Sequence, residues 1–170
     1  MNAYTPKMSA TEFDPLAFRE IMGQFATGVT VITTIGDNGA PVGMAVNSFA
    51  SVSLDPPLVV WSINLNAPSL SAFRGHPSFA INIMCEQSKD LALNFARPSD
   101  NKFADVAWSG GLDGVPVLDA ASTVIQCRTD MRIPGGDHEM YLGRVFDFHK
   151  TDKAPLIFHK GKFAKLGNVL

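Results

Sequence analysis

At 170 residues, 46% of them hydrophobic, the chain is long and apolar enough for one domain with a single packed core. Its 14 basic and 16 acidic residues leave a formal net charge of -2 and do not cluster, which argues against binding to nucleic acid or an anionic membrane. Two cysteines are too few for a disulfide framework, and the N-terminus has neither a signal-peptide pattern nor a membrane-spanning run. We therefore expect a cytoplasmic protein.

The first predicted element is a short helix. A flexible polar lead is expected at residues 1–13, followed by one domain over residues 14–170. Asp14 is a suitable N-cap and Pro15 suits the first helical position. Apolar residues then recur on one face, and the pattern predicts a helix that ends near Gly28.

The remaining pattern is mainly extended. β-branched residues at 29–35, a turn signal at 37–39 and a second extended stretch from Val42 predict a β-hairpin. Later elements follow in chain order: buried strands at 58–65 and 79–84 separated by a helical turn within 68–75, a helix from Ser88 that stops at Pro98, and strands at 123–133, 138–150 and 156–159. Strands with a few short helices and no regular βαβ alternation indicate a β-barrel or sandwich.

Several motifs of common enzyme classes are absent from the sequence. There is no phosphate-binding loop, no G-x-G-x-x-G between a strand and a helix, no C-x-x-C and no G-x-S-x-G. The four histidines and two cysteines lie at none of the spacings typical of metal ligands, so we expect no metal site.

One run is rich in hydroxyl and amide side chains, namely NSFASVS at residues 47–53, just before Asp55-Pro56-Pro57. If the run is a continuous strand, alternate residues from Asn47 to Ser53 share one polar face. That face suits a flat heteroaromatic ring with a phosphorylated tail, because it offers hydrogen-bond donors to both parts. A solvated passage from strand to loop has the same composition, so residue chemistry alone leaves both interpretations open.

Three motifs make the sequence resemble a known family. They are FATGVTVITT at residues 25–34, GMAVNSFASVSLDPPLV at 43–59 and GGDHEMYLGRV at 135–145. In this order they are similar to the flavin reductase domain of two-component flavin-dependent monooxygenases, from about Phe18 to Gly167. The resemblance implies an FMN-binding split β-barrel with short helices, a homodimer, and hydride transfer from NADH or NADPH to FMN or FAD. It also implies release of the reduced flavin to a partner monooxygenase.

The resemblance further implies which residues bind the flavin. They fall in three segments: Thr27, Gly28, Val29 and Thr30; Asn47, Ser48, Ser51, Val52 and Ser53; and Ser69, Leu70, Ser71 and Phe73. The third segment would close on the phosphate or on the edge of the ring. Arg74 beside it is either a phosphate ligand or a surface charge.

His138 is the predicted catalytic residue. From the residues alone, Gly136-Asp137-His138 predicts a hairpin turn with a half-exposed histidine. In similar reductases this histidine lies over the flavin where the nicotinamide stacks, which implies that His138 positions the cofactors, with Tyr141 as a neighbour. Hydride transfer needs no dedicated acid–base pair, because the two cofactors carry the chemistry themselves.

Other functions stay open on the sequence. A split-barrel flavoprotein with a retained flavin would reduce another acceptor, for example a corrinoid. A non-catalytic carrier would bind flavin without turnover, and a structural interaction domain would not bind it at all.

Overall fold

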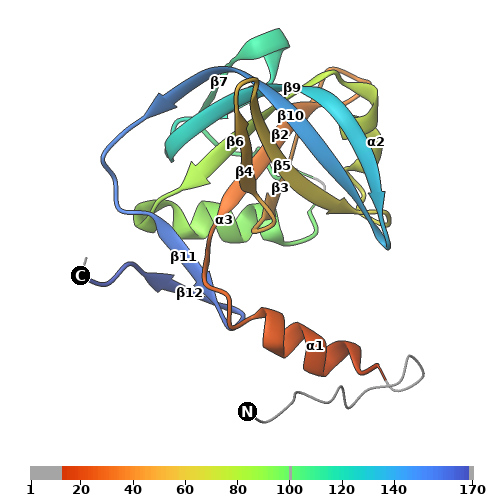
Figure 1. The fold of residues 1–170 in the computed structure, drawn as a ribbon. Coiled ribbons are helices and arrows are strands. Elements are labelled where there is room, and N and C mark those ends of the chain that lie inside the picture. Colours follow the sequence, from red (N-terminus) through yellow and green to blue (C-terminus); the bar gives the residue numbers. More distant parts are fainter. Residues whose placement is uncertain (1–12, 100, 169–170) are drawn as a thin grey trace.

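The computed structural model describes residues 13–99 and 101–168. Residues 1–12 of the predicted lead therefore lie outside the described residues. A seven-stranded antiparallel sheet in the order β3-β2-β6-β9-β10-β5-β4 forms the centre of the molecule (Figure 1). Its strands are β2 (Thr30–Ile35), β3 (Pro41–Val46), β4 (Ala50–Leu54), β5 (Pro57–Asn64), β6 (Ser78–Met84), β9 (Ala121–Gly135) and β10 (His138–Lys150). The predicted mainly-β class is confirmed.

Two tight turns set the register of this sheet. Gly39 adopts a φ of 76° in the turn between β2 and β3, and Gly136 a φ of 70° in the turn between β9 and β10. Positive φ values favour glycine, because a β-carbon would crowd the backbone there. Both hairpins follow the sequence prediction, and the second places His138 directly opposite Gly135.

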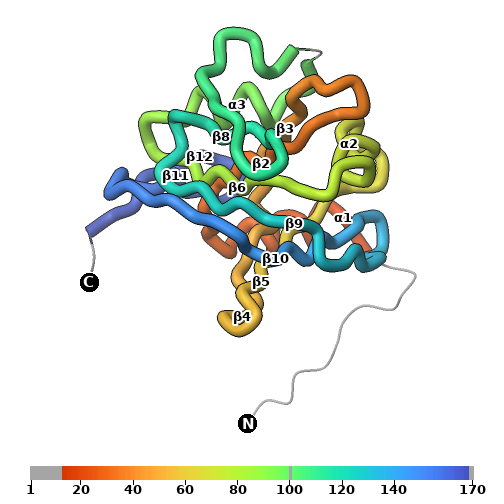
Figure 2. Tube along the Cα trace, turned by 90° about the horizontal axis from the view of Figure 1, so that it is seen from above, coloured from red at the N-terminus to blue at the C-terminus, as the bar shows by residue number. Residues whose placement is uncertain are grey.

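Aromatic side chains fill the interior of the barrel. Trp61 of β5 stacks on Tyr141 of β10 with ring centroids 4.7 Å apart, and Phe79 of β6 packs edge-on against both rings. Met44 of β3 packs against the same cluster, so strands from opposite ends of the sheet share one core. That shared core explains why the sheet curls into a barrel, while the β4–β5 hairpin projects from its side (Figure 2).

A second core lies between the sheet and helix α3 (Lys89–Ala96), which follows the 3-10 turn η1 (Glu86–Ser88). Phe95 of α3 packs so closely on β3 that a β-carbon at Gly43 would come within 2.7 Å of its ring. The helix begins where the sequence predicts, but the Ser88 hydroxyl donates to the Cys85 carbonyl instead of capping the helix.

The first and last described elements of the chain form a separate layer beside the barrel (Figure 1). Helix α1 (Pro15–Met22) starts at Asp14, whose carboxylate accepts the Leu16 amide at 2.8 Å, as predicted. It ends at Met22, not near Gly28, because residues 27–28 form strand β1 (Thr27–Gly28). β1 pairs with β11 (Leu156–His159), which pairs with β12 (Lys162–Lys165). That pairing is a long-range contact that the helical pattern does not contain.

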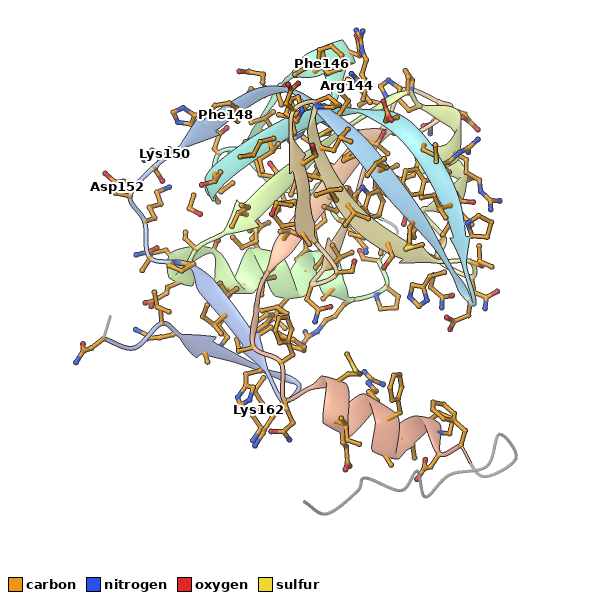
Figure 3. The ribbon with its side chains drawn as sticks, viewed as in Figure 1. Arg144, Phe146, Phe148, Lys150, Asp152 and Lys162 are labelled. Atoms are coloured by element: carbon orange, nitrogen blue, oxygen red, sulfur yellow. The ribbon has the colours of Figure 1, made fainter. Side chains whose placement is uncertain are left out.

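The outer half of β10 extends beyond the barrel. β5 pairs with β10 only as far as Arg144, and the rest of β10 continues as a ribbon with β9. Phe146 and Phe148 are exposed on this ribbon (Figure 3). The small elements that complete the fold are β7 (Trp108–Gly110), η2 (Leu112–Gly114), β8 (Pro116–Leu118) and α2 (Leu70–Gly75).

Candidate functional site

A chain of contacts brings the predicted site segments to one end of the barrel. The Thr30 hydroxyl donates to the Val46 carbonyl at 3.1 Å, which joins the start of β2 to the end of β3. The Ser69 hydroxyl lies 3.4 Å from the Met44 sulfur, which places the start of α2 against β3. His138 pairs with Asn64 at the end of β5. Segments far apart in sequence thus share one surface.

The polar loop, which we define as residues 47–53, is not the continuous strand that simple alternation predicts. β3 ends at Val46, residues 47–49 leave the sheet, and β4 begins at Ala50. A register shift between Ser51 and Ser53 breaks the alternation again. The loop is nevertheless accessible, since most of its side chains are exposed.

Ser48 holds the polar loop on β5. Its hydroxyl donates to the Ser62 carbonyl at 3.1 Å and accepts the Ser62 amide at 3.0 Å. The Ser48 side chain thus makes with the Ser62 backbone the two hydrogen bonds that a residue of a neighbouring strand would otherwise make. Ser48 therefore shapes the loop, and Asn47 and Ser51 are left exposed beside it.

The first of the three predicted flavin-binding segments, residues 27–30, contains a buried hydroxyl and borders open space. The Thr27 hydroxyl oxygen is buried and has no hydrogen-bond partner among the described residues. A β-carbon at Gly28 would meet nothing within 4 Å. Val29 and Thr30 are only 4% and 3% exposed, so a bound molecule would meet mainly their backbone. A buried hydroxyl without a partner is costly, which points to a ligand that completes it.

The third segment is divided between surface and core. Ser71 is exposed and Ser69 is half-buried, whereas Leu70 and Phe73 lie in the barrel core. Arg74 does not lie free beside them, because its guanidinium forms an ion pair with Glu139 at 2.8 Å. The Arg74 hydrogen bond holds the pKa of the Glu139 carboxyl below its ordinary value. Of the two roles left open for Arg74, this arrangement fits a structural tie between α2 and β10.

His138 is presented at the same end of the barrel by the β9–β10 turn. Its Nδ1 lies 2.7 Å from the Asp137 carboxylate, and the side chain is 41% exposed. The Asp137 backbone carbonyl accepts the Leu65 amide at 2.9 Å, which fixes the turn against the end of β5. The His138 hydrogen bond lowers the pKa of Asp137. The second ring nitrogen of His138 is left for a ligand.

Tyr141 lies in a different environment from the one that its predicted role suggests. It is completely buried and stacked on Trp61 inside the barrel. Burial raises the pKa of Tyr141 to about 12, so its phenol is neutral at any physiological pH. It supports the strand that carries His138 and does not reach the surface where a nicotinamide would stack.

The structure also contains a pocket that the sequence does not indicate. It has a volume of about 540 Å³ and lies between β3 and the segment after α3. We call it the β3–α3 pocket, and it is lined by residues 40–45, 67–69, 95–99 and 101–103. Ser69 is the one predicted site residue in its lining. The cationic side chains among its described lining residues are Arg97 and Lys102, which belong to none of the sequence motifs. They lie near β3 because α3 packs against the sheet.

The residues at this end of the barrel fit a flavin. The exposed polar loop offers donors to ring carbonyls and nitrogens, and the buried Thr27 hydroxyl lacks a partner in the part of the chain that the structure describes. Ser69 and Ser71 add hydroxyls suited to a phosphate. The site can therefore hold a flat ring with a phosphorylated tail.

Comparison with known proteins identifies the family. Residues 22–167 match the family model described as the flavin reductase like domain. The chain belongs to this family. The family resemblance read from the three sequence motifs is thus confirmed, and the polar loop lies within the matched region.

Individual relatives agree with the family. The reductase component of a flavin-dependent trigonelline monooxygenase from Acinetobacter baylyi is 41% identical over 145 residues, which cover 85% of this chain and 47% of the relative. An NADH-dependent FMN reductase from Agrobacterium fabrum is 39% identical over 88% of this chain and 84% of its own length. This chain spans about half the length of two of the curated relatives that it matches.

A solved structure supports the fold. The NADH:FAD oxidoreductase of Streptomyces globisporus superposes with a TM-score of 0.86 at 30% identity, over 99% of this chain and 96% of its own. Among residues 13–99 and 101–168, no helix is long and apolar enough to cross a membrane.

Proposed function

We propose that this chain is an NAD(P)H:flavin oxidoreductase that transfers a hydride from NADH or NADPH to FMN or FAD. The observation that carries the proposal is an accessible polar loop whose neighbours lead to Thr27 on one side and to His138 on the other. The Thr30–Val46 hydrogen bond joins its start to the segment of Thr27, whose buried hydroxyl has no partner among the described residues. The Ser48–Ser62 hydrogen bonds join it to β5, the strand that pairs with His138. The names of the two relatives described above and of the Streptomyces structure support the same activity.

A bound flavin supplies the two-electron chemistry, and the chain binds and orients. Asn47, Ser51 and Ser53 of the polar loop would hold the ring by hydrogen bonds, and donors at these positions would stabilise negative charge on it. Thr27 completes its hydrogen bond with the ligand, while Gly28 and Val52 provide close contacts. Ser69 and Ser71 bind the phosphate. Leu70, Phe73 and Tyr141 hold these segments in place from the core.

His138 positions the nicotinamide nucleotide. Asp137 fixes the ring through Nδ1 at 2.7 Å, so that the other nitrogen points away from the turn. A ring fixed in this way would limit the orientations of a bound nicotinamide nucleotide, and orientation is a main contribution that a protein makes to hydride transfer.

Two assemblies belong to the proposal. The first is a complex or exchange of reduced flavin with a flavin-dependent monooxygenase, supported by the name of the Acinetobacter relative. The second is a homodimer, supported by α1, which has no buried residue and exposes Phe18, Ile21 and Met22.

A cytoplasmic location is also part of the proposal, and it is supported by Cys85 and Cys127, which are both buried and free.

The decisive experiment measures steady-state oxidation of NADH and NADPH with FMN, FAD or riboflavin in excess. Many turnovers per chain support a reductase, whereas one equivalent of oxidation indicates a carrier. Gel filtration after loading then separates a flavin-releasing enzyme from one that retains its cofactor for another acceptor, such as a corrinoid. No oxidation with any pair of substrates would refute the proposal.

A further inference from the structure

The carboxylate that fixes His138 is itself held by the end of β5. One oxygen of Asp137 lies 2.7 Å from Nδ1 of His138, and the side-chain amide of Asn64 donates to the other oxygen at 3.4 Å. His138 also lies directly opposite Asn64 in the pairing of β10 with β5. The three side chains therefore form a row that runs from the Asn64 amide through the Asp137 carboxylate to the imidazole.

A second hydrogen bond sets the direction in which the Asn64 side chain points. Its Oδ1 accepts the backbone amide of Asn66 at 2.8 Å, in a local turn that asparagine commonly makes. Because the oxygen is used in this turn, the NH2 group faces the other way, toward Asp137. The backbone turn thus fixes the orientation of the donor.

The backbone that carries Asn64 is anchored on both sides. Before it, Ile63 is completely buried in the barrel core. After it, the Leu65 amide donates to the Asp137 carbonyl and the Ala67 amide donates to the Asn64 carbonyl, each at 2.9 Å. The Asn64 donor therefore has a fixed place beside the turn that presents His138.

The Asp137 side chain needs this support because it is 81% exposed on a turn. An exposed side chain samples several rotamers, and a change of rotamer would move the acceptor away from the His138 ring. The Asn64 donor favours the rotamer in which both carboxylate oxygens are engaged. The direction of the His138 ring then depends on a residue that does not touch it through a hydrogen bond.

The strand that carries His138 is held by a separate interaction. The ion pair of Arg74 with Glu139, at 2.8 Å, ties the start of β10 to α2 and involves neither Asn64 nor Asp137. Loss of the Asn64 donor should therefore leave β10 in place and disturb only the orientation of the imidazole.

We propose that Asn64 is a positioning residue for hydride transfer, which orients Asp137 and through it the ring of His138 toward the nicotinamide nucleotide. The inference rests on the proposed function, because it takes His138 to contact that nucleotide. Asn64 itself transfers no proton and makes no bond to the reacting atoms. Its contribution is to limit the orientations of the imidazole before the nucleotide binds.

The first test is Asn64→Asp, which keeps an oxygen for the Asn66 amide but replaces the donor to Asp137 with a second carboxylate. We expect KM for the nicotinamide nucleotide to rise about tenfold, with the flavin dissociation constant nearly unchanged. Asn66→Asp is the matched control, since it adds the same charge two residues further along at an exposed position. Equal effects of the two changes would mean that only the added charge matters and would overturn the proposal.

The second test is a double-mutant cycle, which asks whether Asn64 acts through His138. Asn64→Ala should lower kcat/KM about threefold in the wild-type background, because one hydrogen bond is lost. In a protein that already carries His138→Ala it should have no further effect. Effects that multiply would show an independent, merely structural role. Thermal unfolding checks that each variant folds, and Asn64→Ala keeps the cycle valid if Asn64→Asp does not fold.

The third test needs no turnover. The ¹⁵N NMR signals of the neutral His138 ring report which nitrogen carries the proton, and in the wild type we expect Nδ1 to carry it. Asn64→Asp should give a mixture of the two tautomers, whereas Asn66→Asp should not. The same tautomer in all three proteins would refute the role of Asn64. If the wild type oxidises no nicotinamide nucleotide, the proposed function fails, and this measurement still decides whether Asn64 orients the ring.

Discussion

At His138, a neighbouring carboxylate decides which ring nitrogen faces outward. The Nδ1 atom lies 2.7 Å from Asp137, so a neutral ring donates there and leaves Nε2 as an acceptor. The sequence predicts a half-exposed histidine after a turn, and the structure agrees, with 41% of the side chain exposed. The proposed role of this histidine comes from the family motif and not from the local pattern, because many hairpins carry the same residues.

His138→Ala tests this role. We expect KM for NADH to rise about tenfold, because one positioning contact is lost, with the flavin dissociation constant nearly unchanged. The measurement combines steady-state kinetics with fluorescence titration of flavin. His149→Ala, an exposed histidine further along β10, is the control. Equal effects of the two changes would show that His138 has no special place in the site.

The Arg74–Glu139 pair makes a prediction about pH. The pKa of Glu139 lies below its ordinary value of 4.5, chiefly because Arg74 bonds it. The pair therefore contributes stability above about pH 4.5 and loses it as pH falls through the lowered pKa. In Arg74→Met, the Glu139 pKa measured by NMR titration should rise. A phosphate-ligand role would instead weaken binding of FMN far more than binding of riboflavin, which has no phosphate.

At the scale of elements, local patterns predict what local contacts determine. Asp14 caps α1 and glycines close the two hairpins, and both features can be read from neighbouring residues. The end of α1 and the break between β3 and β4 at residues 47–49 cannot be read from neighbouring residues. The first depends on pairing of β1 with β11, more than a hundred residues away, and the second on the Ser48–Ser62 hydrogen bonds.

Ser48→Ala tests how the polar loop is held. Two hydrogen bonds to β5 would be lost at a partly exposed position, so we expect the free energy of unfolding to fall by about 1 kcal/mol. Flavin affinity should also fall, because the loop is no longer fixed. Chemical denaturation and flavin titration measure the two effects. Ser109→Ala, an exposed serine of β7, should change neither.

At the scale of the whole molecule, packing between distant segments creates what the sequence does not indicate. The barrel class follows from strand patterns, and the three segments proposed to bind flavin come from the family motifs. The β3–α3 pocket does not, since α3 must dock on β3 before Lys102 can approach Met44. Gly43 permits this docking by leaving room for the Phe95 ring, a constraint that shows only in three dimensions.

The exposed face of α1 makes the last prediction. Phe18, Ile21 and Met22 are 48%, 66% and 55% exposed, and the helix projects from the barrel (Figure 1). Helices of this length are stable in water mainly when an apolar face is covered. We therefore expect a dimer in sedimentation experiments and a monomer for Ile21→Asp, with Arg19→Gln on the same helix as control. A monomeric wild-type protein would contradict the assignment of this face to a second copy.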